Sequence, residues 1–98
     1  MINKLKICSS FYDIECLDEL KDGNENLFGD IEYGLLKIRI NKKYHIDRQK
    51  QAILHEAMHG INYEYQFGFN EKMIERISNA FYAFLIDNKE FIGKIIGS

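Results

Sequence analysis

The chain lacks the features of a membrane protein, a secreted protein or a nucleic-acid-binding protein. No apolar run approaches the roughly 18 to 20 residues that cross a bilayer, and the first residues lack the apolar stretch of a signal peptide. The formal net charge of -2 provides no electrostatic attraction for a polyanion. We therefore expect a cytosolic protein that binds neither a membrane nor nucleic acid.

Proline and tryptophan are absent, and there are only 2 cysteines. Cys8 and Cys16 could form one disulfide, but in a cytosolic chain we expect free thiols. There is no internal repeat, and 46% hydrophobic and 29% charged residues are typical of globular domains, which argues against disorder, a coiled coil or a collagen-like chain. The 98 residues suffice for one domain, 1–98, and carry no indication of its oligomeric state.

The first forty residues have the pattern of short strands. Leu5 and Ile7 alternate with lysines, and a second apolar stretch begins at Phe11 after a Ser9-Ser10 turn, which predicts a hairpin. Residues 21–26 contain no apolar side chain and predict an exposed loop. Residues 27–33 and 36–41 then predict a second pair of strands.

The second half of the chain has the spacing of helices. A first helix is predicted from about Asp47 to a left-handed end at Gly68, and Asn70 is suited to cap a second. Asn88 is suited to cap a short third helix that ends near Gly97. The apolar stripes of the first two helices are Leu54, Ala57, Met58, Ile61 and Tyr65, and then Ile74, Ile77, Phe81, Phe84 and Leu85. Strands followed by helices predict an α+β fold, with two or three helices on one face of a small antiparallel sheet.

The first predicted helix contains His55-Glu56-Ala57-Met58-His59. At 100° per residue the two histidines lie about 40° apart around the axis and one turn apart along it, so they can share one metal ion. Glu56 lies about 100° away, within reach of a water on the metal, where it can act as general base. Zn²⁺ is a Lewis acid that suits these ligands. In a chain of this composition, with 3 histidines, the expected number of chance occurrences of this pattern is about 0.01.

A catalytic zinc site usually has three protein ligands, so a third donor is required. The second predicted helix offers Glu75, which lies on one line with Asn79 and Tyr82 beside its apolar stripe. We favour Glu75 as the third ligand and expect Asn79 to hydrogen-bond a ligand histidine. Glu71 is the rival ligand, although its position in the first helical turn is explained by capping and the helix dipole.

One further hydrogen-bond donor could stabilise an oxyanion at the metal. Tyr82 is the leading candidate because it lies near the line of Glu75 and Asn79. Spacing does not single out the other three candidates. We expect His45 to be exposed in a polar loop and the remaining two to be packing aromatics, Tyr63 and Tyr65.

The motif His55-Glu56-x-x-His59, followed by Glu75-x-x-x-Asn79-Ala80-Phe81, resembles the ImmA/IrrE family of zinc metallopeptidases over residues 35 to 88. The resemblance implies a short sheet before the motif helix, ligands at His55, His59 and Glu75, and Glu56 as catalytic base. It also implies an origin in a phage, a prophage, another mobile element or a bacterium. The chain departs from the family at Ser78, where alanine is common.

These observations predict a zinc-dependent endopeptidase that hydrolyses a peptide bond in a protein substrate, which by family analogy could be a transcriptional repressor. One alternative is a catalytically silent zinc-binding interaction protein from a phage or mobile element. The other is a structural zinc module that uses Cys8, Cys16, His55 and His59, although seven residues separate the cysteines where zinc modules usually have two to four.

Overall fold

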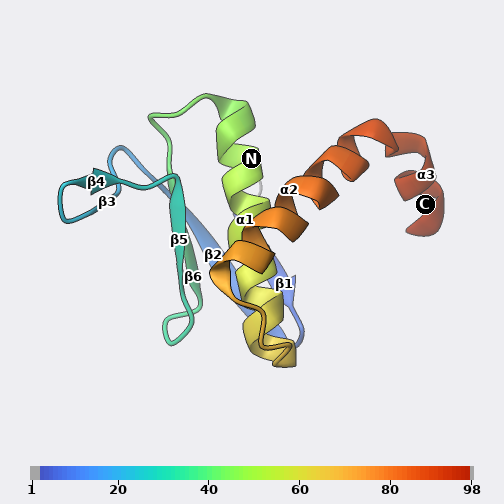
Figure 1. The fold of residues 1–98 in the computed structure, drawn as a ribbon, viewed down its shortest axis with the longest axis horizontal. Coiled ribbons are helices and arrows are strands. Elements are labelled where there is room, and N and C mark those ends of the chain that lie inside the picture. Colours follow the sequence, from blue (N-terminus) through green and yellow to red (C-terminus); the bar gives the residue numbers. More distant parts are fainter. Residues whose placement is uncertain (1–2, 98) are drawn as a thin grey trace.

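A computed structural model describes residues 3–97 (Figure 1). Within these residues six strands precede three helices, which confirms the α+β class. The strands are β1 (Lys4–Ile7), β2 (Ser10–Leu17), β3 (Lys21–Asp22), β4 (Glu25–Asn26), β5 (Gly29–Glu32) and β6 (Lys37–Asn41). The helices are α1 (Ile46–Tyr65), α2 (Glu71–Asp87) and α3 (Lys89–Ile95). None of these helices has the length and apolarity needed to span a lipid bilayer.

The main sheet is mixed, which corrects the prediction of an antiparallel one. Its strand order is β1-β2-β6-β5, and the predicted hairpins β1–β2 and β5–β6 are both present. The strands of the two hairpins that meet at the centre, β2 and β6, pair in parallel. The exposed stretch 21–26 forms a small separate hairpin from β3 and β4. β5 is the last strand in the order of the main sheet and therefore forms one of its edges.

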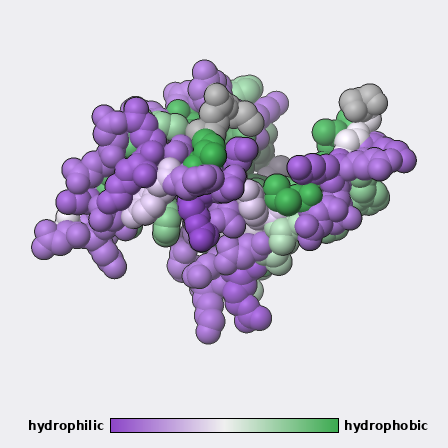
Figure 2. Space-filling model, turned by 90° about the horizontal axis from the view of Figure 1, so that it is seen from above, coloured by the Kyte–Doolittle hydropathy of each residue, from purple (hydrophilic) through white to green (hydrophobic). Residues whose placement is uncertain are grey.

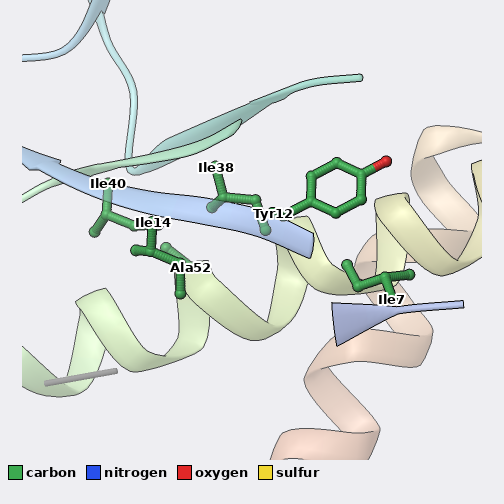
Figure 3. Close-up of a cluster of buried hydrophobic side chains, with 6 residues drawn as sticks. All are labelled: Ile7, Tyr12, Ile14, Ile38, Ile40 and Ala52. Atoms are coloured by element: carbon green, nitrogen blue, oxygen red, sulfur yellow. The ribbon is translucent and has the colours of Figure 1, made fainter. Parts of the chain in front are cut away.

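The core lies between one face of this sheet and α1 (Figure 3). The alternation of the strands puts apolar side chains on this face, because successive residues point to opposite sides. The buried cluster consists of Ile7, Tyr12, Ile14, Ile38, Ile40 and Ala52. The Tyr12 hydroxyl donates a hydrogen bond to Glu64 Oε2 at 2.7 Å, which ties β2 to the last turns of α1.

α1 approaches the sheet closely along a line of residues four apart, Ala52, Glu56 and Gly60. A Cβ atom added to Gly60 would lie 2.7 Å from Ile7 Cδ1, so the missing side chain allows this approach. His45 occupies the N-cap position that the sequence suggested for Asp47, and its Nδ1 accepts from the backbone N–H of Asp47. The left-handed residue at the C-cap of α1 is Gln66 rather than Gly68.

α2 begins as predicted, but most of its apolar stripe is not buried. Asn70 caps the helix, with its side chain accepting from Met73 N at 2.9 Å. Only Ile74 and Ser78 are buried in α2, because the helix crosses α1 with its first turns and then runs away from the body of the domain. Figure 1 shows its later turns and α3 projecting from the rest of the chain. Asn88 occupies the N-cap of α3 without a side-chain capping bond.

Candidate metal centre

The motif helix places His55 and His59 on the side of α1 that α2 crosses. Their ring centroids are 4.9 Å apart, as one helical turn predicts. The first turn of α2 passes over them, and Glu71 reaches both imidazoles. The Nε2 atoms of His55 and His59 lie 3.1 and 2.7 Å from the two carboxylate oxygens of Glu71.

Ligand atoms of His55, His59 and Glu71 all lie within 4.8 Å of one another, so this group could hold a metal ion. Within residues 3–97 it is the only group of three or more His, Cys, Asp and Glu side chains with this geometry. The two imidazoles and one carboxylate match a donor set found in catalytic zinc sites. Burial lowers the pKa of His59, which favours the neutral imidazole that metals bind, although the Glu71 carboxylate opposes this effect.

The metal-capable cluster therefore contains Glu71, the rival candidate, and not the favoured Glu75. Glu75 lines the same cavity, but its carboxylate is not part of the cluster. The reason is how α2 lies on α1: its first turn brings Glu71 to the Nε2 atoms of both histidines, and Ser78, two turns later, reaches Nδ1 of His55. The spacing of residues along α2 does not reveal this arrangement.

A short hydrogen-bond chain fixes the orientation of His55. Its Nδ1 lies 3.1 Å from the buried Ser78 hydroxyl, which donates to the backbone carbonyl of Glu75 at 3.1 Å. Because that hydroxyl proton is already used, Nδ1–H donates to Ser78 Oγ, and the 3.1 Å contact between Nε2 and Glu71 Oε1 requires a proton or a metal ion between the two atoms. Ser78 thus makes the contact that we predicted for Asn79, which is exposed at the edge of the cavity.

Glu56 is buried beside the cluster, with only 7% of its surface exposed. Its aliphatic part lies against β5, since a Cβ added to Gly29 would lie 3.5 Å from Glu56 Cγ. Burial raises the pKa of Glu56 to about 8, and the negative charges of Glu71 and Asp30 add to this effect. A cation held at Glu71 would cancel one of these causes and favour the ionised carboxylate.

The cluster opens into a cavity of about 750 Å³ between α1, the start of α2 and β5. Gly29, Asp30 and Ile31 of the edge strand form one wall. Arg48, Gln51 and Ala52 extend the histidine side of α1 toward its N-terminus. Sequence reasoning missed these α1 residues, although steps of three and four back from His55 would have found them.

Tyr33 and Phe28 are the phenyl-ring residues that line this cavity, whereas Tyr82 is not among the lining residues. Sequence spacing gave no signal for Tyr33, because it follows β5 and is far from the motif. Its ring stacks on Tyr63, with centroids 4.2 Å apart. Burial and the nearby carboxylates of Glu56 and Glu71 raise its pKa, so the hydroxyl stays protonated and can donate a hydrogen bond.

The remaining candidates lie outside the cavity. His45 is exposed at the start of α1, as expected, and Tyr63 and Tyr65 are both 55% exposed. Cys8 and Cys16 are exposed free thiols, and neither belongs to the metal-capable cluster.

In comparisons with known proteins, no protein-family model, no curated protein and no solved structure matches the chain.

Proposed function

We propose that this chain is a cytosolic zinc-dependent endopeptidase related to the ImmA/IrrE group. The observation that carries the proposal is the convergence of His55, His59 and Glu71 beside the buried Glu56, in a cavity open to solvent. Two imidazoles and one carboxylate leave room for water and substrate on a four-coordinate ion. Bound zinc would act as a Lewis acid toward water and a substrate carbonyl.

Glu56 has the position and environment of a general base. It is next to His55 on α1, and it is buried, so that few water molecules can hydrogen-bond to its carboxylate. In the ionised form it can take a proton from the attacking water and later deliver it to the leaving amine. Tyr33 could donate a hydrogen bond to the developing oxyanion, which makes it a better candidate than Tyr82 for this role.

The edge strand β5 supports a peptide as substrate. β5 pairs with β6 on one side, and within residues 3–97 no strand pairs with its other side. An extended peptide can add to such an edge through backbone hydrogen bonds, independently of its sequence. Because Gly29, Asp30 and Ile31 line the cavity, a peptide bound there would pass beside the metal cluster.

The test is the substitution Glu56→Gln in zinc-loaded protein, with Glu90→Gln as control. Glu90 is an exposed residue of α3, and its side chain is 88% exposed. We expect the wild type and the control to generate new peptide termini in a proteome-derived peptide library, detected by mass spectrometry. Glu56→Gln should lose this activity by about 10²- to 10⁴-fold and keep its zinc.

Equal cleavage by the wild type and Glu56→Gln would refute the assigned base. Zinc binding without any cleavage by the wild type would favour the catalytically silent interaction protein. Loss of zinc in a Cys8→Ala, Cys16→Ala double variant would favour the structural zinc module, which the exposure of both thiols argues against.

A further inference from the structure

The C-terminal arm, defined as residues 79–97, contains no buried residue. It comprises most of the later turns of α2 and all of α3, and α3 contacts only α2. A seven-residue helix is too short to be stable in water by itself, because isolated helices below roughly 12 residues are marginal. α3 therefore depends on its packing against α2, to which the core adds no contact.

A single apolar face runs along α2 and onto α3. At 100° per residue, the side chains of Met73, Ile77, Phe81 and Phe84 lie within about 80° of one another on α2. Phe84 stacks edge-on against Phe91 of α3, with centroids 6.3 Å apart, which extends the face. Figure 2 shows apolar residues at the surface of this projecting part of the molecule. The arm face consists of Met73, Ile77, Phe81, Phe84, Phe91 and Ile95, each between 36% and 61% exposed.

We propose that the arm face is the contact between two copies of this chain in a symmetric dimer. At about 150 to 250 Å² per large side chain, roughly half exposed, the six residues offer about 500 Å². A stable interface buries about 800 Å² per partner, of which about 65% is apolar in homodimers. The arm face thus has the area that such a dimer requires.

The charges around the arm face are consistent with self-association. At 100° per residue, Arg76 and Asp87 lie about 80 to 100° from the middle of the arm face on α2, and Lys94 lies about 80° from the middle of Phe91 and Ile95 on α3, so the border carries both signs of charge. A border of one sign would repel a second copy and would favour a partner of opposite charge. With both signs present, a cation of one copy can pair with an anion of the other, and the two-fold axis repeats the same pair in reverse.

Dimerisation through this face would leave the metal centre open. Glu71, Glu75 and Asn79 line the cavity, and they lie about 160° around α2 from the middle of the arm face. The α2 residues that pack inward, Ile74 and Ser78, lie between these two sides. Each copy would keep its own site, so the proposal does not depend on the proposed peptidase activity.

The test is the molar mass of the full chain, measured by light scattering from about 1 to about 200 µM. The wild type should be a dimer in the upper part of this range. Phe84→Glu should weaken dimerisation at least about 30-fold, the effect of losing one interface hot spot. Ile86→Glu is the matched control, because it places the same charge on a residue that is 49% exposed and lies about 180° around α2 from the middle of the arm face, and it should remain dimeric.

Circular dichroism and zinc binding should be unchanged in both variants, which separates this test from that of the metal site. If Phe84→Glu unfolds, Phe84→Ala and amide exchange of residues 79–97 provide the same test, and wild-type exchange should slow at high concentration. A wild type that stays monomeric to about 200 µM, or a Phe84 variant that dimerises as well as Ile86→Glu, would overturn the proposal. The face would then belong to another protein or a lipid surface.

Discussion

The carboxylate of Glu71 lies where two interactions that favour an anion coincide. One is with the imidazole nitrogens of His55 and His59, and the other is with the N-terminus of α2, whose free N–H groups attract negative charge. The side chain of Glu71 is also 65% exposed, so a cation can reach it from solvent. Glu75, a turn further along, lies beyond the reach of the helix terminus.

We therefore expect Glu71→Ala to lower metal affinity much more than Glu75→Ala. Losing a partner that only hydrogen-bonds a ligand already costs about 10- to 100-fold, so loss of a ligand should cost more than about 100-fold. Glu75→Ala should change affinity by no more than a few fold. Competition with a chromophoric chelator measures both variants. The reverse order would restore the assignment made from the sequence.

Glu56 should make the stability of the metal-free protein depend on pH. Its pKa in the folded state is about 8, whereas an exposed glutamate ionises near 4.5. The folded state therefore keeps a proton that the unfolded state releases, and stability falls as the pH rises from 4.5 to 8. The loss should amount to about 3 to 5 kcal/mol, since a tenfold change in proton affinity corresponds to about 1.4 kcal/mol.

Urea denaturation of the wild type and Glu56→Gln at several pH values measures this loss. The lowered pKa of His59 makes stability rise with pH below the ordinary pKa of histidine. Both proteins contain His59, so the difference in stability between the wild type and Glu56→Gln isolates the effect of Glu56. The stability of the wild type relative to Glu56→Gln should decrease steadily toward pH 8. A constant difference would mean that Glu56 is not perturbed.

At the scale of the element, β5 supplies both a wall of the cavity and the surface against which Glu56 packs. Its close pairing with β6 depends on Gly29. A Cβ atom at this position would lie 2.9 Å from the backbone oxygen of Arg39 and 3.0 Å from Ile40 Cδ1. The backbone oxygen cannot move without disturbing the pairing of the two strands.

Gly29→Ala should destabilise the protein by about 1 to 3 kcal/mol, the usual cost of overpacking. Gly34→Ala is the control, because a Cβ atom there meets nothing within 4 Å. Its free energy of unfolding should stay within about 0.5 kcal/mol of the wild type. Equal stability of the two variants in urea would show that β5 can shift to make room.

Elements with a strong local signal were predictable from the sequence. The period of α1, the Asn70 cap and the two hairpins depend on neighbouring residues, and all three are present. The parallel pairing of β2 with β6 joins residues 24 positions apart, such as Asp13 and Lys37, and no local pattern encodes it. The same holds for the crossing of α1 and α2, which decides between Glu71 and Glu75.

At the scale of the whole molecule, the metal-capable cluster links two elements that otherwise meet over a short stretch. His55 and His59 belong to α1, and Glu71 belongs to α2. A ligand that binds only the folded state stabilises it by mass action, by about 2.7 kcal/mol at 100 times the dissociation constant. The main sheet does not contact α2, so α2 is held to the body through α1, by the packing of Ile74 and Ser78 and by this cluster.

Zinc at that concentration should therefore raise the midpoint of thermal unfolding by about 10 to 20 °C, since about 1 kcal/mol shifts a domain of this size by about 4 to 8 °C. Differential scanning calorimetry with zinc or with a chelator measures the change. Glu71→Ala should show little of it. If the midpoint of thermal unfolding of the wild type does not change with zinc, a metal site of useful affinity is excluded.

The capping bond of Asn70 has a consequence for the rate at which a cation could leave. Glu71 is the residue directly after this cap, and the cap's hydrogen bond to Met73 N, 2.9 Å long, holds the first turn closed. If that turn opened, the carboxylate would move away from the two imidazoles, which belong to α1. We expect the residence time of a bound ion to depend on how often this helical turn opens. Asn70 would then control the release of the ion without contacting it.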